Sequence, residues 1–261
     1  MYSLRGIIIK DDNRYSYTEE YLKKRGIIFD VHEKSDMDII IFPFKSEPDQ
    51  NIYNDNYFSN LKKDIYIFSG LRNEYLSNKC KEHGLSYYVM LEALSVQINN
   101  AIPTSEGVIE YIITNRTNTI HNSRILIIGY GVCGSDLAKR LKALGADVYA
   151  LVRNKEKESV AYSDSITPIY FKELSCTGKL RAFDVIVNTV PARIFTNEMT
   201  SLTGDTLLID IASSPYGFDI ELAKKNNEKS AILPGIPGKY AIKTAGEILG
   251  GYIFDTISSK E

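Results

Sequence analysis

Three glycines near the middle of the chain have the spacing needed to hold a phosphate group. Gly129, Gly131 and Gly134 follow the apolar run 125–128 in a G-x-G-x-x-G pattern. The first glycine permits a tight strand-to-helix turn, the second lets backbone approach a pyrophosphate, and the third lets the helix lie close to the strand. N–H groups at the start of that helix would then face the phosphates. The pattern predicts a dinucleotide site.

The elements around the glycines have the patterns that such a site requires. The run 125–128 is apolar throughout, which is typical of a parallel strand covered on both faces. Leu137 and Leu141 then recur at helical spacing, Gly145 follows as a helix-ending glycine, and 147–152 reads as the next strand. Together these residues predict one complete βαβ unit.

Val132 and Cys133 complete the predicted phosphate loop, residues 129–134. For Cys133 we favour the role of a small residue in a crowded turn over that of a thiol activated by the helix N-terminus. The other cysteines, Cys80 and Cys176, are distant in sequence, and no Cys/His metal pattern is present. We therefore expect no disulfide framework, no metal and a reducing, cytoplasmic environment.

Composition narrows the classes of partner. The chain has 261 residues, 44% of them hydrophobic, and a formal net charge of −2 with both signs interspersed. That balance gives no electrostatic basis for binding nucleic acid. No apolar stretch has membrane-spanning length and no secretory core follows Met1, so we expect no membrane association.

The fold class predicted is α/β, with a doubly wound parallel-sheet Rossmann domain and a smaller N-terminal α/β domain of Rossmann-like type. The N-terminal domain is expected over 1–117, including a linker helix at 103–117. The dinucleotide-binding domain follows at 118–235, and a C-terminal helix at 236–261 is expected to pack back toward the N-terminal domain. Residues 10–13 occupy the turn where a second dinucleotide site would need glycines.

Arg153 bears on the choice of cofactor. NAD sites usually place an Asp or Glu about twenty residues after the glycines, where it accepts hydrogen bonds from the ribose 2′-OH. Here Arg153 lies 24 residues after Gly129, and 152–155 holds no Asp or Glu at the matching place. A guanidinium pairs well with a 2′-phosphate, so NADP is favoured over NAD. The alternative is that Arg153 is a solvated loop charge.

Further cofactor contacts are expected beyond the carboxyl ends of the strands, where open α/β sheets bind ligands. The candidates are Asn188, Thr189, Val190, Pro191, Ser213 and Gly235. For Asn188 and Thr189 a backbone-capping role in a turn is an equal alternative, and Gly235 could be a turn residue alone.

Several segments around the glycines resemble the family of the dipicolinate synthase A-subunit, the larger subunit of that enzyme. The resemblance spans roughly residues 65–249 and is carried by 69–73, 100–107, 119–123, 188–191, 210–215, 234–238 and 243–246. The sequence departs from the family pattern at Val132, Ser214 and Ile242, and the family's Gly-Gly-Asp-x-Arg turn is reduced to Asp12 and Arg14. These departures leave the substrate and the subunit pairing open.

The resemblance implies NADP-linked oxidation of a dihydrodipicolinate ring to dipicolinate during spore formation, with the small flavoprotein-like B-subunit of dipicolinate synthase as partner. Such a reaction loses a proton as well as a hydride and acts on a small dicarboxylate. Lys243 is the leading candidate cation, Glu106 the candidate base and Thr104 a candidate hydrogen-bond donor. The alternative for Lys243 is an ordinary exposed lysine. Glu106 could instead stabilise its helix as an acid in the first turn, and Thr104 could be a cap.

Two other functions stay open from the sequence. One is an NADP-dependent oxidoreductase of another small carboxylate, and the other is a non-catalytic module that senses a dinucleotide. In each case a homo-oligomer is expected.

Overall fold

The computed structural model describes residues 4–32, 37–174, 179–196, 199, 205–227 and 229–259. The chain divides into two units, one formed by Met1–Asn100 with Ala241–Glu261 and the other by Ala101–Tyr240. The sequence places the domain boundaries at 117 and 235, whereas these units divide at 100 and 240.

The second unit contains a parallel sheet whose described strands follow the order β11-β10-β9-β6-β7-β8. Chain order therefore reverses between β6 and β9, which is the switch point of a doubly wound Rossmann sheet. The predicted fold class is confirmed. The strands are β6 (Arg124–Ile128), β7 (Asp147–Val152), β8 (Thr167–Tyr170), β9 (Val185–Asn188), β10 (Leu207–Asp210) and β11 (Ser230–Ile232).

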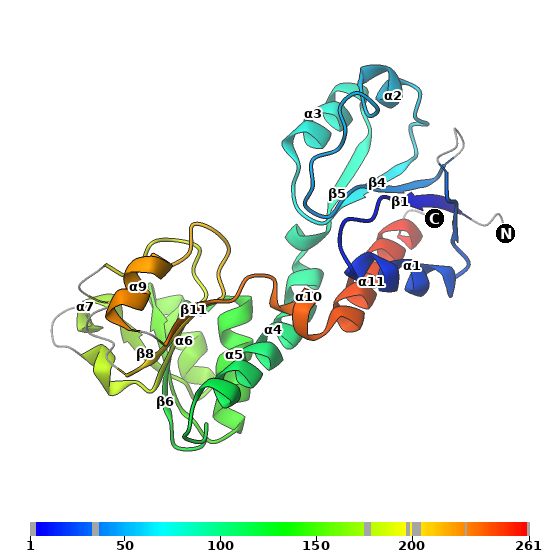
Figure 1. The fold of residues 1–261 in the computed structure, drawn as a ribbon. Helices are drawn as coiled ribbons and strands as arrows, with labels where there is room; N and C mark the ends of the chain where they lie inside the picture. Colours follow the sequence, from blue (N-terminus) through cyan, green and yellow to red (C-terminus); the bar gives the residue numbers. More distant parts are fainter. Residues whose placement is uncertain are drawn as a thin grey trace. The chain divides into compact units, whose positions relative to one another are not determined.

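Helices cover both faces of this sheet (Figure 1). They are α5 (Val132–Ala143), α6 (Lys155–Ser163), α7 (Phe171–Leu174), α9 (Ile220–Asn226) and α10 (Ile236–Tyr240), with the 3-10 turn η2 (Lys179–Ala182). Helix α4 (Leu94–Asn115) enters this unit at Ala101. The linker helix predicted from residue 103 thus begins at Leu94, because buried Val96 and Ala101 extend its packed face and outweigh the missing N–H of Pro103.

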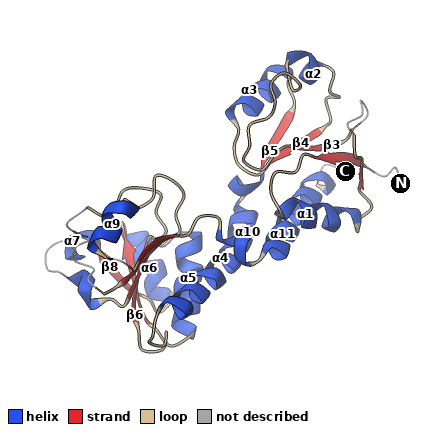
Figure 2. Cartoon of the chain, viewed as in Figure 1, coloured by secondary structure: helices blue, strands red, loops and turns tan. Residues whose placement is uncertain are grey.

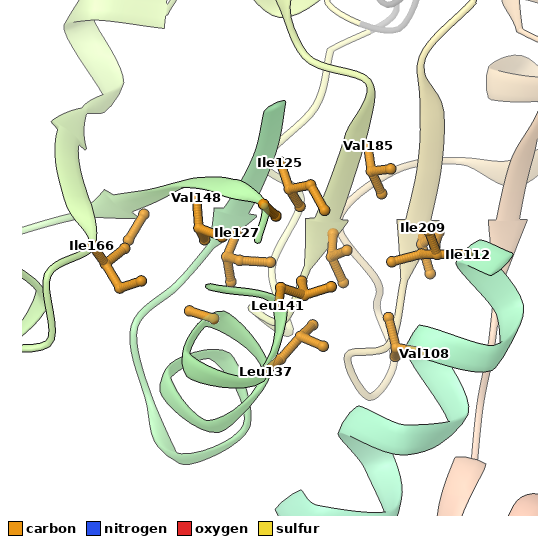
Figure 3. Packing of buried hydrophobic residues seen from close by; sticks show 14 of the residues in the cluster. Val108, Ile112, Ile125, Ile127, Leu137, Leu141, Val148, Ile166, Val185 and Ile209 are labelled. Carbon is orange, nitrogen blue, oxygen red and sulfur yellow. The ribbon is translucent and has the colours of Figure 1, made fainter. Parts of the chain in front are cut away.

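The core of the second unit follows the alternation of its strands. Ile125 and Ile127 of β6 face one layer of the core, while Leu126 and Ile128 pack in the layer on the other face. Figure 3 shows residues of α4 and α5 pointing at the first of these layers. They are Val108, Ile112, Leu137 and Leu141, all fully buried. Burial on both faces accounts for the uninterrupted apolar run before the glycines.

The first unit has a parallel sheet of its own, in the order β2-β1-β3-β4-β5. Figure 2 labels its strands β3, β4 and β5. The strands are β1 (Arg5–Ile8), β2 (Ile28–Phe29), β3 (Ile39–Ile41), β4 (Tyr66–Ser69) and β5 (Ser86–Val89). Its helices are α1 (Arg14–Lys23), α2 (Asp55–Ser59), α3 (Glu74–His83), the 3-10 turn η1 (Met90–Glu92) and α11 (Ile242–Ser258). This order is again doubly wound, with its switch point between β1 and β3.

The C-terminal segment predicted as one helix over 236–261 forms two helices that belong to different units. The backbone leaves helical geometry at Ala241, which has φ −141° and ψ 56°. Before that break, Ile236 of α10 packs against Gly107 of α4, where an added Cβ would lie 2.4 Å from the Ile236 side chain. After it, α11 packs on α1 in the first unit (Figure 1). Competing burial in two cores explains the break.

Glycines on α11 allow α1 to approach closely. A Cβ at Gly246 would lie 2.4 Å from the Arg14 carbonyl oxygen, and the Thr18 hydroxyl donates to the Gly246 carbonyl over 2.9 Å. A Cβ at Gly251 would lie 3.5 Å from the Tyr21 hydroxyl oxygen, an ordinary contact. The two glycines are therefore unequal: only Gly246 holds a place that no side chain can share.

This difference predicts opposite effects on stability. Gly246→Ala is expected to lower the free energy of unfolding by about 1–3 kcal/mol through overpacking. Gly251→Ala, the matched control on the same helix, is expected to raise it by up to about 1 kcal/mol through helix propensity. Urea denaturation measures both, and equal effects of the two substitutions would contradict the packing described here.

None of the helices in the described part of the chain has the length and apolar content needed to cross a bilayer.

Candidate functional site

The phosphate loop joins β6 to α5 at the switch point of the second sheet. Gly129 has φ +91°, a backbone conformation that favours glycine, and a Cβ there would lie 2.7 Å from the Thr189 hydroxyl oxygen. A Cβ at Gly134 would lie 2.1 Å from the Gly129 carbonyl oxygen. A side chain at Gly129 would push away the loop after β9, and one at Gly134 would push α5 away from β6. The turn can therefore close only with glycine at both positions.

Gly131 differs from its two neighbours because the space around it is open. No heavy atom of the described residues beyond its neighbours lies within 4 Å of a Cβ built at Gly131, which is the N-cap of α5. The first intrahelical bond there is donated by Ser135 N–H to the Gly131 carbonyl. The N–H groups of Val132, Cys133 and Gly134 thus have no acceptor within the helix and can bind an anion.

A cavity of about 420 Å³ opens beside this loop, and we call it the cofactor cavity. Its walls are mainly apolar and come from the ends of β6, β7 and β9, so it lies at the carboxyl edge of the sheet. It is lined by Ile128, Gly129, Tyr130, Gly131, Leu151, Val152, Arg153, Lys157, Phe171, Thr189, Val190, Pro191 and Ile194. An apolar cavity with a few polar groups at a switch point is what a dinucleotide site requires.

The charged groups of the cofactor cavity are both positive. Arg153 follows β7 directly and Lys157 belongs to the first turn of α6. The residues that line the cavity include no carboxylate. Neither cation has an ion pair within the described part of the chain. The cavity can therefore hold an anionic ligand without displacing an internal partner.

Asn188 and Asp210 brace the loops that follow β9 and β10. Asn188 is fully buried, and its side-chain amide donates to the Asp210 carboxylate over 3.1 Å and to the Val190 carbonyl over 2.9 Å. Asp210 also accepts hydrogen bonds from the backbone N–H groups of Ala212 and Gly217. Burial raises the pKa of Asp210, and these donors oppose the rise. Asn188 thus holds the loop after β9 in shape and does not itself line the cofactor cavity.

The other predicted cofactor residues divide into two groups. Thr189, Val190 and Pro191 line the cofactor cavity, and the Thr189 hydroxyl donates to the Ile128 carbonyl over 2.9 Å. Ser213, in the loop that contains the cis Ser214–Pro215 bond, and Gly235, which has φ +65°, are exposed and lie outside the lining.

Cys133 has an environment that opposes thiolate formation. Burial, with a smaller contribution from Asp136, raises the pKa of its thiol. Cys133 and Cys80 are free cysteines, while Cys176 lies outside the described residues. A packing role for Cys133 agrees with this environment.

Thr104 and Glu106 lie on α4 and do not line the cofactor cavity. Thr104 is buried, with 9% of its surface exposed. The Glu106 side chain is 64% exposed and lies 4.0 Å from the Arg140 guanidinium of α5. Arg140 itself donates to Asp136, which accepts a second hydrogen bond from buried Ser105. Glu106 therefore belongs to the polar contact between α4 and α5.

Lys243 belongs to the first turn of α11, in the first unit, and is exposed. The side chain of Lys24, and at longer range the charge of Lys243, lower the pKa of Glu20. A lysine in the first turn of a helix is opposed by the helix dipole. The charge of Lys243 therefore does not stabilise the start of α11, as the charge of a carboxylate at that position would.

Comparison with known proteins adds to this geometry. Residues 102–204 match the family model described as the D-isomer specific 2-hydroxyacid dehydrogenase, NAD binding domain. The dipicolinate synthase A-subunit from Bacillus subtilis (strain 168) is 32% identical over 230 residues, which cover 76% of that protein and 83% of this one. This protein belongs to the dipicolinate synthase A-subunit family. The resemblance seen in the sequence is confirmed.

Solved structures of the same family share the fold over nearly the whole length. The dipicolinate synthase A-subunit from Bacillus subtilis superposes with a TM-score of 0.88 at 26% identity, covering 100% of this protein and 99% of the solved one. Its counterpart from Bacillus halodurans gives a TM-score of 0.86 at 25% identity, covering 98% of both proteins. Family and domain together support an oxidoreductase with a nicotinamide dinucleotide cofactor.

Sequence reasoning missed several residues that line the cofactor cavity, among them Tyr130, Lys157, Phe171 and Ile194. Lys157 had a signal in the sequence, because it lies four residues after Arg153 and so within the turn that follows the second strand. The aromatic and aliphatic residues had none. The Tyr130 hydroxyl donates to Asp164 over 2.8 Å, an interaction between residues 34 positions apart that no local pattern indicates.

The turn after β1 shows why the first unit has no matching loop. The Asp11 carboxylate accepts hydrogen bonds from the backbone N–H groups of Phe44, Lys45 and Ser46, beyond the end of β3. Partial burial alone would raise the pKa of Asp11, but these three donors lower it. A side chain of the protein thus occupies the N–H groups that an anionic ligand would use at this switch point.

One group of potential metal ligands is present in the described residues. Ligand atoms of Asp55, Glu82 and His83 lie within 4.8 Å of one another. The Lys79 ammonium donates to Asp55 over 3.1 Å and to Glu82 over 2.7 Å. The Lys79 ammonium thus pairs with both carboxylates, and the His83 ring lies 2.9 Å from Asp55, so the group is a surface ion-pair network.

Gly131 gives a direct test of where the pyrophosphate binds. Gly131→Ala adds a methyl group to open space, so the free energy of unfolding is expected to fall only by the N-cap preference of glycine over alanine, about 1 kcal/mol. The same methyl group would occupy the space of the pyrophosphate and is expected to weaken dinucleotide binding at least about tenfold, or about 1.4 kcal/mol. Isothermal titration calorimetry measures this, and an unchanged dissociation constant would contradict the assignment.

Proposed function

We propose that this protein oxidises a dihydrodipicolinate to dipicolinate with NADP⁺ during spore formation. Its membership of the dipicolinate synthase A-subunit family supports the substrate class. One observation carries the choice of chemistry: an apolar cavity opens beside the glycine turn at the switch point of the sheet, and the charged residues among its described lining are cations. A flat nicotinamide, a diphosphate and a phosphorylated ribose fit that combination.

Arg153 is proposed to select NADP over NAD. Its guanidinium is exposed, lines the cofactor cavity and has no internal ion pair in the described part of the chain. A guanidinium can bind a phosphate monoester through two parallel hydrogen bonds. A plain ribose would instead call for a carboxylate, and the lining offers none.

The reaction assigns distinct tasks to the residues of the protein. When bound, the nicotinamide accepts a hydride from the dihydropyridine ring, and the ring loses one proton as it becomes aromatic. Lys243 is proposed to bind a substrate carboxylate, Thr104 to donate a hydrogen bond to the substrate and Glu106 to accept the proton. Ser213 and Gly235 are proposed to contact the nicotinamide end of the cofactor through their loops, and Val132 and Cys133 the diphosphate through their N–H groups.

A second polypeptide is part of this proposal. The relatives are themselves named as one lettered component of dipicolinate synthase, which implies at least one other component. We propose the small flavoprotein-like B-subunit of dipicolinate synthase as the partner of this protein. We also propose a homo-oligomer that works in the cytoplasm.

The decisive experiment supplies dihydrodipicolinate to the purified protein, first by itself and then with a B-subunit of dipicolinate synthase. NADPH formation at 340 nm with equimolar dipicolinate is the expected result. Turnover of a different hydroxy or keto acid would support another small-carboxylate oxidoreductase. NADPH binding without turnover of any such acid would support a dinucleotide-sensing module.

Charge reversal at Arg153 tests the cofactor preference. Arg153→Asp removes the guanidinium and supplies an acceptor for the ribose hydroxyls, so the NADPH dissociation constant is expected to rise about 10- to 100-fold while that of NADH falls. Fluorescence titration of the reduced cofactors measures both. Equal binding of NADPH and NADH before and after the change would reject the assignment.

Removal of the Lys243 charge tests the substrate role. Lys243→Ala is expected to lower kcat/KM at least about 100-fold, because a substrate carboxylate loses its charged partner. The NADPH dissociation constant should stay within about twofold, a change well below the 1.4 kcal/mol that corresponds to a tenfold change. Lys239→Ala, another exposed lysine nearby in sequence, is the control and should change neither. Lost cofactor binding in Lys243→Ala would remove the residue from the substrate role.

A further inference from the structure

Lys157 is a charged residue of the cofactor cavity that the glycine pattern does not account for. It belongs to the first turn of α6 and lines the cavity together with Arg153. The Asn154 side chain accepts a hydrogen bond from the Lys157 backbone N–H over 2.9 Å, which fixes the start of the helix. Lys157 is half-buried, whereas Arg153 is exposed. The cap thus fixes the backbone of a lysine that lines the cavity.

The neighbouring Lys155 has a different environment. Its side chain is 85% exposed and pairs with Glu158 over 2.7 Å. That ion pair raises the pKa of Lys155. Lys155 does not line the cofactor cavity. Two lysines in one helical turn therefore differ in the property that matters here: only Lys157 faces the cavity without a carboxylate partner in the described part of the chain.

The position of Lys157 carries a cost in stability. The N-terminus of a helix has a partial positive charge, which disfavours a cation in the first turn. Lys155 offsets that cost through Glu158, at i,i+3 spacing. Lys157 has no such compensation. A destabilising cation that lines a ligand cavity points to a functional role.

We propose that Lys157 is the second cation of a 2′-phosphate subsite, in which it shares with Arg153 the phosphate of the adenosine ribose. This inference rests on the proposed use of NADP. A phosphate monoester carries a charge of about −1.5 to −2 at pH 7, so one guanidinium neutralises only part of it. The planar guanidinium and the compact ammonium supply complementary contacts, one bidentate and one a point charge.

The test compares Lys157→Ala with Lys155→Ala in the full-length protein. The probes are adenosine 2′,5′-bisphosphate and adenosine 5′-monophosphate, measured by isothermal titration calorimetry, and NADPH and NADH, measured by fluorescence. Lys157→Ala is expected to raise the dissociation constants of the bisphosphate and NADPH about 5- to 20-fold, as expected for a charge-assisted contact. The dissociation constants of the monophosphate and NADH should change by less than about twofold, which corresponds to under 1 kcal/mol.

Lys155→Ala should leave all four dissociation constants within about twofold. The melting temperature of Lys157→Ala should equal or exceed that of the wild type, because the unfavourable charge at the helix start is removed. Loss of all nucleotide binding with a lowered melting temperature would show a structural role and overturn the inference.

The outcomes separate this inference from the proposed function. A wild-type protein that binds the bisphosphate no better than the monophosphate contradicts the use of NADP itself. A wild-type preference that survives Lys157→Ala unchanged overturns the role of Lys157 alone. A preference that falls in Lys157→Ala and persists in Lys155→Ala supports the shared subsite.

Discussion

The close approach of α5 to β6 is the constraint on which the candidate site depends. A Cβ at Gly134 would lie 2.1 Å from the Gly129 carbonyl oxygen, so the helix can start where it does only with hydrogen at that position. This contact aims the free N–H groups of the first turn of α5 at the open space around Gly131. It also brings the loop after β9 against Gly129, through Thr189 and Val190. The shape of the cofactor cavity follows.

The two sheets of the protein treat their switch points in opposite ways. In the first unit, the Asp11 carboxylate accepts hydrogen bonds from the backbone N–H groups that follow β3. A side chain of the protein thus takes the place of an anionic ligand there. In the second unit, the N–H groups that begin α5 after the first strand have no acceptor within the helix, and the charged residues that line the cavity are cations. One doubly wound topology thus serves as a frame in one unit and as a ligand site in the other. The difference lies in a few residues after the first strand of each sheet.

The sequence and the structure agree most closely where local pattern and burial require the same residues. The glycine turn, the apolar strand before it and the amphipathic helix after it were all predicted, because each pattern has a single local cause. Predictions were weaker where two cores compete for one segment. Val96 and Ala101 extend α4 backward past Pro103, and Ala241 breaks the segment predicted as one C-terminal helix. Burial in separate cores decided both, and no short window of sequence contains that information.

By itself, the sequence determined the fold class, the dinucleotide loop and the family, because glycine spacing and strand alternation express steric limits that act within a few residues. Only the tertiary structure decided which side chains share the cofactor cavity. It brought Phe171 and Ile194 to the cavity that Arg153 lines, set Asn188 on Asp210 and left Glu106 at the α4–α5 contact. Those neighbours come from strands and helices far apart in the sequence, and parallel pairing in the sheet brings their ends together.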